Sequence, residues 1–142
     1  KLVTTELSRN MADITMENGV PHVKKVTCAV DCGIVVNPLG AMNQVKGGVL
    51  DGIGHAMYSD FSFNNGVPQS NNFNTYQLIR MGQTPKVDVH FVESDIDPTG
   101  LGEPTLPPVG AAVANAIHKA TGKRLTKQPY MNNINVDKKI LG

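Results

Sequence analysis

Alternation of apolar and polar residues predicts a β-hairpin near the start of the chain. Residues 1–10 form a polar lead-in without clear periodicity. Residues 11–17 alternate loosely and end at Asn18-Gly19, a dipeptide that favours tight hairpin turns. The run 22–32 is rich in β-branched residues, and we expect it to return as the antiparallel partner strand before Gly33 breaks it.

A third strand is predicted over residues 86–93. Val87, Val89 and Phe91 fall on one face and polar residues on the other, which is the period of a half-buried strand. A second hairpin signal, Asn65-Gly66, lies between two short apolar runs. The sequence therefore predicts one principal hairpin, one further strand and one small surface hairpin.

Two helices are predicted from their ends. Asn37 can cap a helix that begins at Pro38, because asparagine accepts a hydrogen bond from a free amide of the first turn and proline fits the first position. This helix extends to about residue 58. The alanine-rich run 111–121 predicts a second helix, which Gly122 ends.

The first predicted helix is unusually rich in glycine. Each glycine in a helix interior costs about 0.5–1 kcal/mol relative to alanine, so this helix needs tertiary contacts. Gly48, Gly52 and Ala56 follow one another at intervals of four residues and form a smooth face. Such a face lets either a packed element, such as the sheet, or a ligand approach closely, and the sequence favours neither.

The order strand, strand, helix, strand, helix predicts an α+β fold. We expect a two-layer α/β sandwich in which a mixed sheet carries two main helices on one face. A chain of 142 residues fits one domain. We expect residues 1–142 to form a single domain, with the core at about 11–129 and a mobile tail at 130–142.

Charge and hydropathy exclude several classes of protein. The 13 basic and 12 acidic residues nearly balance, whereas nucleic-acid binding requires clustered positive charge. No apolar run reaches the roughly 18 residues that indicate a membrane span. The chain begins at Lys1 and not at methionine, so we expect a piece of a longer protein, and both bacterial cytoplasm and periplasm stay open as its location.

Cysteine and histidine spacing argues against a disulfide or a zinc site. Cys28 and Cys32 lie on the predicted second strand, where four residues span about 13 Å. A disulfide requires Cα atoms within about 7 Å, so these thiols should not bridge and are expected to be small buried hydrophobes. The four histidines are scattered without ligand spacing.

Residues 97–108 are rich in proline and glycine and predict a rigid loop. This loop presents Glu103 close to a helix start. A carboxylate whose position is fixed before the reaction is suited to general-base chemistry. Composition alone favours the other interpretation, a surface acid whose charge suits the positive end of the next helix. Gln44 is similarly either an amide donor to a cofactor or a solvated helix residue.

Seven motifs occur in one order along the chain: Asp31-Cys32-Gly33, Asn37-Pro38, Gln44-Val45-Lys46-Gly47-Gly48, Thr75-Tyr76, Gly100-Leu101-Gly102-Glu103-Pro104, Ala112-Val113-Ala114-Asn115-Ala116-Ile117 and Thr121-Gly122-Lys123-Arg124. Together they resemble the C-terminal part of the molybdopterin-binding large subunit of the xanthine dehydrogenase and aldehyde oxidase family, and most of all the isoquinoline 1-oxidoreductase β-subunit type. The resemblance covers about residues 11–129. Its most specific part is G-x-G-E-P combined with the upstream Q-x-x-G-G.

The resemblance implies roles for matching residues. Glu103 matches the family's catalytic glutamate, the base that takes a proton from a molybdenum-bound hydroxide. Gln44 matches a glutamine that hydrogen-bonds the molybdenum centre or its pterin. Gly47, Gly48 and Gly102 fall where backbone approaches the molybdopterin cofactor. In this family the pterin's dithiolene sulfurs hold the metal, so no metal-ligating side chains are expected.

One position departs from the family pattern, because Lys46 stands where many members have glutamate. Its charge either faces solvent or alters the pterin surroundings. The resemblance further implies three partners: the remainder of the large subunit, an iron–sulfur or other electron-transfer subunit, and a small aldehyde or N-heterocycle substrate. We expect the chain alone to be inactive, without stoichiometric molybdenum, and to expose apolar surface that the remainder covers.

Two competing functions stay open at the sequence level. A non-catalytic interaction domain would retain the fold without the chemistry. A small nucleotide binder would use the glycines and would be stabilised by nucleotides. The substrate, the electron acceptor and the oligomeric state are not determined by the motifs.

Overall fold

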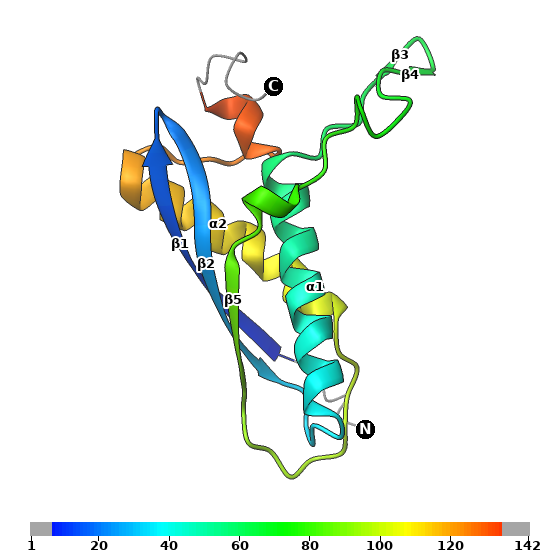
Figure 1. Cartoon of the computed structure of the whole chain (residues 1–142), viewed down its shortest axis with the longest axis vertical. Coiled ribbons are helices and arrows are strands. Elements are labelled where there is room, and N and C mark those ends of the chain that lie inside the picture. Colours follow the sequence, from blue (N-terminus) through cyan, green and yellow to red (C-terminus); the bar gives the residue numbers. More distant parts are fainter. Residues whose placement is uncertain (1–6, 135–142) are drawn as a thin grey trace.

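The computed structural model describes residues 7–134 and shows an α+β fold (Figure 1). Three strands form one sheet in the order β1-β2-β5, and β3 and β4 form a separate hairpin. The elements of the described range are β1 (Leu7–Glu17), β2 (Val20–Asp31), α1 (Pro38–Met57), β3 (Phe63–Asn64), β4 (Val67–Pro68), η1 (Met81–Gln83), β5 (Lys86–Phe91), η2 (Glu103–Thr105), α2 (Leu106–Thr121) and η3 (Tyr130–Asn133).

The sheet is mixed, as predicted. β1 and β2 pair antiparallel, whereas β5 lies parallel to β2 on its other side. The turn between β1 and β2 places Asn18 at φ 53° and Gly19 at φ 80°. Both angles are in the left-handed region that tight hairpin turns require, which explains why the Asn-Gly dipeptide marks the turn. The second Asn-Gly dipeptide forms the β3–β4 turn in the same way.

A β-bulge changes the phase of β2. The register shifts between Asp13 and Ile14, which pair with Lys25 and Val23 respectively, so Lys24 is an extra residue on β2. Because of this extra residue, Val23 and Val26 both face the core although they are three positions apart. The bulge therefore lets one strand bury a valine on each side of the lysine pair.

The predicted start of α1 at Asn37-Pro38 and the predicted end of α2 at Gly122 are both confirmed. The side chain of Asn37 accepts a hydrogen bond from the Gly40 amide at 3.1 Å, and α1 ends at Met57. Gly122 follows α2 at φ 73°, and its N–H donates to the His118 carbonyl at 2.7 Å. These caps satisfy backbone groups that a helix end otherwise leaves free.

The rigid loop predicted over residues 97–108 is wrong for its last six residues. Glu103–Thr105 form η2, and α2 begins at Leu106 instead of residue 111. Pro107 and Pro108 fall in the first turn of α2, where an amide donor is not needed and the fixed φ of proline suits the helix. Proline therefore starts this helix and does not exclude it.

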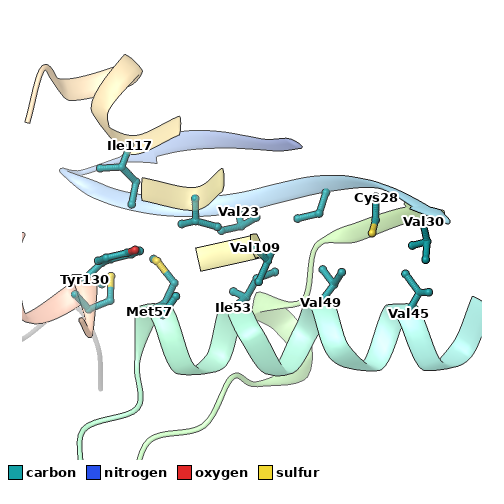
Figure 2. Packing of buried hydrophobic residues seen from close by; sticks show 14 of the residues in the cluster. Val23, Cys28, Val30, Val45, Val49, Ile53, Met57, Val109, Ile117 and Tyr130 are labelled. Carbon is teal, nitrogen blue, oxygen red and sulfur yellow. The ribbon is translucent and has the colours of Figure 1, made fainter. Parts of the chain in front are cut away.

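Both long helices pack on one face of the sheet and form the second layer of a two-layer sandwich. α2 lies against β1, and α1 lies against α2 and β5 (Figure 1). Valines of α1 and α2 meet valines of β2 in one continuous core (Figure 2). The residues of this core are Val20, Val23, Val26, Cys28, Val30, Cys32, Val45, Val49, Ile53, Ala56, Met57, Val109, Val113, Ile117, Tyr130 and Met131.

Two boundaries differ from the sequence prediction. β1 begins at Leu7, although residues 7–10 read as an aperiodic polar lead-in. The packed core also extends past residue 129, because Tyr130 and Met131 in η3 are buried. The hydroxyl of Tyr130 donates to the Gly110 carbonyl at 3.1 Å, which fixes η3 to α2. The rest of the predicted tail, residues 135–142, lies outside the described residues.

The segment between α1 and η1 projects away from the body of the molecule as an arm (Figure 1). It carries the β3–β4 hairpin, where Phe61 and Phe63 contact edge to face with ring centroids 5.0 Å apart. Residues 59–78 contribute nothing to the core cluster of the described chain. Among the described residues, the helices are too short or too polar to cross a membrane.

Candidate functional site

The turn that carries Glu103 packs against the middle of α1. At Gly48, an added Cβ would lie 2.6 Å from the Gly102 carbonyl oxygen and closer still to the Thr105 hydroxyl. At Gly52, an added Cβ would lie 2.6 Å from the Leu106 carbonyl oxygen. The glycine face of α1 is therefore covered by η2 and the start of α2, and not by the sheet. Packing within the chain accounts for the face, which leaves no surface there for a nucleotide.

Thr105 closes the turn from inside. It is fully buried, its hydroxyl donates to the Gly102 carbonyl at 2.8 Å, and its N–H donates to the same carbonyl at 3.3 Å. The hydroxyl also lies 3.4 Å from the Val45 carbonyl oxygen of α1. Thr105 thus links the two ends of the turn to each other and to α1.

β1 holds the same turn from the opposite side. The Ser8 hydroxyl donates to the Pro104 carbonyl at 2.6 Å, and the Asn10 amide donates to the Thr105 carbonyl at 3.1 Å. These polar side chains explain why β1 begins earlier than the sequence predicts. Their alternation is that of a strand, but the face that they occupy binds backbone carbonyls instead of apolar side chains.

Gln44 and Gly102 lie side by side. Gly102 adopts φ 128°, in a region that disfavours other residues, and an added Cβ would lie 3.7 Å from the Gln44 side-chain nitrogen. Glu103 follows directly and is exposed, as is Gln44. The structure therefore brings together Gln44, Gly102 and the turn of Glu103, three positions that the sequence singles out.

The remaining predicted positions on α1 separate into two kinds. Gly47 is exposed, and nothing lies within 4 Å of the place where a Cβ would stand. Gly48, the next residue, faces the turn as described above, so chain packing alone requires a glycine there. Lys46 is half-buried and forms no salt bridge with any residue between 7 and 134.

The loop that leads into the turn is attached to the end of β2. The Thr99 amide donates to the Cys32 carbonyl at 3.0 Å, and the Ile34 amide donates to the Ile96 carbonyl at 3.1 Å. Gly33, at φ 71°, lies so close to the backbone of Asp97 that a side chain would overlap it. These contacts hold the first part of the loop, as the predicted rigidity requires.

A cluster of charged side chains lies on the outer face of the sheet. Asp88 forms salt bridges with Lys25 at 2.8 Å and Lys86 at 3.2 Å. The hydrogen bond from Lys25, followed by that from Lys86, holds the pKa of Asp88 below its ordinary value. This cluster stabilises the pairing of β2 with β5 and is remote from the positions that the motifs indicate.

Cys28 behaves as the buried hydrophobe that the sequence predicts. Its side chain is fully buried in the core, and desolvation raises the pKa of its thiol to about 11. Cys32 is also buried. Across the described residues, no group of three or more histidine, cysteine or acidic side chains is arranged to hold a metal ion.

A pocket of the described chain lies at the other end of α1. It has a volume of about 810 Å³ and is lined by polar and aromatic residues that include Tyr58, Phe73 and Arg80. Gln44 and Glu103 do not line it. At the candidate site on α1 and η2, the side chains of Gln44 and Glu103 are both exposed.

Comparison with known proteins now identifies the family. A family model described as a molybdopterin cofactor-binding domain matches residues 11–85, more than half of the chain. The chain belongs to this family. The resemblance to the molybdopterin-binding subunits of xanthine dehydrogenases and aldehyde oxidases is thereby confirmed, and molybdopterin is the cofactor of the family.

Two relatives cover most of the chain. A membrane-bound aldehyde dehydrogenase of Gluconacetobacter polyoxogenes, whose name specifies pyrroloquinoline-quinone, is 40% identical over 82% of this chain and 15% of its own length. Isoquinoline 1-oxidoreductase subunit beta of Brevundimonas diminuta is 36% identical over 75% of this chain and 14% of its own length. The chain thus spans about one seventh of these relatives.

Solved structures share the fold. The aldehyde oxidoreductase from Desulfovibrio gigas superposes with a TM-score of 0.75 at 28% identity, over 87% of this chain and 14% of that one. Quinoline 2-oxidoreductase from Pseudomonas putida 86 superposes with a TM-score of 0.71 at 19% identity, over 78% of this chain and 15% of that one. The predicted two-layer α+β architecture is therefore one that molybdenum hydroxylases contain.

Sequence reasoning missed the residues that hold the turn. Thr105 stands in a proline-rich stretch and carries no motif signal of its own. Ser8 is 96 positions from its partner Pro104, so no local pattern could link the two. The one available signal was the period-two spacing of Ser8 and Asn10 in the polar lead-in.

Proposed function

We propose that this chain is part of a molybdenum hydroxylase that oxidises an aldehyde or an N-heterocycle with oxygen derived from water. In this proposal Glu103 is the general base, and Gln44, Gly47, Gly48 and Gly102 form part of the molybdopterin cradle. The single observation that carries the proposal is the placement of the Glu103 turn beside Gln44, because a base must act next to the cofactor.

The residues present are suited to holding a pterin. The exposed Gln44 amide offers a donor and an acceptor, which match the donor and acceptor edges of a pterin ring. Gly47 exposes backbone without a side chain, so a flat ligand can approach α1 closely there. Gly48 contributes indirectly by admitting the Glu103 turn to the same side of α1.

The bound cofactor would supply the redox chemistry, with its own sulfurs holding the metal. The residues of this chain would then accept a proton and hold the base in a fixed position. The Glu103 carboxylate accepts a proton from the water-derived oxygen, which makes that oxygen a better nucleophile toward an electron-poor carbon. Because the turn is fastened to α1 and β1 before substrate arrives, little ordering of the base is needed during the reaction.

This chain exposes apolar side chains that other polypeptide could cover. Near the start of α1, Val36 is 80% exposed and Leu39 is 68% exposed, and in η1 Met81 is 90% exposed. Large exposed apolar side chains gathered on a domain mark interaction surfaces. We assign these surfaces to the remainder of the large subunit, with an iron–sulfur or other electron-transfer subunit beyond it, so the chain alone should be inactive.

The test is a Glu103→Gln exchange in the complete, cofactor-loaded protein. Removing the base should lower kcat by about 10²–10⁴-fold while molybdenum content and thermal stability stay unchanged. Glu93→Gln is the matched control, because Glu93 is also exposed and lies outside the turn. If the Glu103 variant keeps the wild-type rate, the chain is an interaction domain that retains the fold without this chemistry.

A second measurement tests the requirement for partner polypeptide. Elemental analysis of the purified 142-residue chain should find far less than one molybdenum per chain, because Gln44 and Glu103 are exposed and other polypeptide is proposed to complete the site. One tightly bound molybdenum per chain would contradict the proposal that other polypeptide completes the site.

A further inference from the structure

We infer that Thr105, assisted by Ser8, is a positioning residue for Glu103. The inference rests on the proposed role of Glu103 as the base. Neither residue reaches the reacting atoms in this assignment. Each instead fixes a backbone carbonyl of the turn that carries Glu103, and thereby the direction in which the carboxylate leaves the chain.

The hydroxyl of Thr105 sits where only an apolar group would be expected. Thr105 is 0% exposed and is, among the described residues, the one non-aromatic polar side chain in the core. Burying a hydroxyl is unfavourable unless it is hydrogen-bonded, and valine would fill nearly the same volume. The Thr105 hydroxyl therefore needs a carbonyl partner, and the Gly102 carbonyl at 2.8 Å is the nearer one, with the Val45 carbonyl at 3.4 Å. The bond to Gly102 is what threonine provides here and valine would not.

The bond closes the turn around Glu103. Gly102 and Thr105 are the first and fourth residues of the turn, and Glu103 and Pro104 lie between them. The Gly102 carbonyl receives both the hydroxyl and the N–H of Thr105, at 2.8 Å and 3.3 Å. Because the ring of Pro104 also fixes its own φ, few torsions remain by which the backbone of Glu103 could rotate.

Ser8 secures the turn from outside. Its hydroxyl donates to the Pro104 carbonyl at 2.6 Å, from the strand that lies opposite α1. The turn is thus bound to the interior by Thr105 and to β1 by Ser8. Loss of the Ser8 bond frees the Pro104 carbonyl, and loss of the Thr105 hydroxyl leaves the Gly102 carbonyl with the weaker bond from the Thr105 N–H. Neither bond involves the side chain of Gln44.

This arrangement predicts a specific kinetic pattern. A misplacement of about 1 Å in a reacting group can cost about 100-fold in rate. Thr105→Val retains the shape of the side chain and removes the bond, so kcat should fall by about 10- to 100-fold with KM within about twofold of wild type. Thr105→Ser retains the hydroxyl and should preserve most of kcat, which separates the bond from the packing.

The experiment uses the complete enzyme and compares kcat, KM and molybdenum content for Thr105→Val, Thr105→Ser and Glu103→Gln. Thr121→Val is the matched control, since the Thr121 hydroxyl also donates to a backbone carbonyl, that of Ile117, but at the far end of α2. Hydrogen–deuterium exchange of residues 100–108 provides a readout independent of activity. Exchange there should rise in Thr105→Val and stay at the wild-type level in Thr121→Val.

The outcomes distinguish the inference from the proposed function. If Glu103→Gln is inactive and Thr105→Val has the wild-type kcat, the inference is overturned and the proposed function stands. If Glu103→Gln is active, both fail. Loss of molybdenum from folded Thr105→Val would also overturn the inference, because the residue would then serve cofactor binding.

Should Thr105→Val fail to fold, Ser8→Ala decides, because Ser8 is only partly buried and tolerates truncation. A kcat lowered by about 3- to 10-fold at constant KM supports positioning. An unchanged kcat in Ser8→Ala overturns it.

Discussion

Gly48 and Gly47 are adjacent residues of α1 for which the same substitution should have opposite effects. An alanine Cβ at Gly48 would stand 2.6 Å from the Gly102 carbonyl oxygen, whereas ordinary contact begins at 3.4 Å, so the turn must shift by nearly 1 Å. Overpacking of this kind costs about 1–3 kcal/mol. At Gly47 nothing lies within 4 Å, and the helix gains about 0.5–1 kcal/mol from alanine.

Urea denaturation of the two variants beside the wild type measures this difference. The free energy of unfolding should be lower than wild type for Gly48→Ala and higher for Gly47→Ala, and the two variants should differ by about 1–3 kcal/mol, the cost of overpacking, at an unchanged m-value. Both variants are Gly→Ala exchanges at adjacent positions in the middle of α1, so the gain in helix propensity is the same in both and cancels in the comparison. A Gly48→Ala protein as stable as Gly47→Ala would refute the close packing of the Glu103 turn on α1.

Two further predictions concern residues remote from the candidate site. Lys25 and Lys86 lower the pKa of Asp88 in the folded protein, so Asp88 contributes stability above its unfolded pKa of about 4 and loses that contribution as pH falls through the lower folded pKa. Asp88→Asn should therefore be less stable than wild type at pH 7 and lose less stability on acidification, as urea titrations between about pH 2 and 7 would detect; parallel profiles would argue against the salt bridges. The Cys28 thiol, fully buried with its pKa raised to about 11, should resist alkylation at about pH 8 until the protein is unfolded, and rapid labelling of the native protein would contradict its burial.

Elements defined by adjacent residues were predicted well from the sequence. The hairpin at Asn18-Gly19, the start of α1 at Asn37-Pro38 and the end of α2 at Gly122 each depend on the backbone preferences of one or two residues. Such preferences act locally, so they can be recognised without knowledge of the fold.

Elements defined by distant contacts were not. Residues 7–10 belong to β1 because they pair with the end of β2, and the side chains of Ser8 and Asn10 bind carbonyls nearly one hundred positions away. α2 starts at Leu106 and not at residue 111, because Pro107 and Pro108 belong to the first turn of the helix, which accepts proline. In both cases a residue that is unfavourable in the middle of an element is favourable at its end or beside a particular partner.

In the candidate site, too, local motifs could be recognised from the sequence, whereas contacts between distant residues could not. Composition and spacing marked Glu103 and Gln44 as ambiguous, and the family motifs were needed to select them. The motifs could not reveal that Gly48 admits the turn or that Thr105 closes it, because both facts concern the fit between α1 and η2. The Q-x-x-G-G motif thus contains a residue that acts on neighbouring backbone, Gly48, as well as residues proposed to contact the cofactor.

The arm that carries β3 and β4 and the packed body of the molecule differ in what they contribute to stability. Residues 59–78 leave and rejoin the body without supplying a single core side chain among the described residues, while the strands and helices that frame Glu103 depend on one another for burial. Mutations along the arm can accordingly accumulate at little energetic cost to the framework. Substitutions along the arm should therefore change its surface without loosening the packing of the turn on which the proposed chemistry depends.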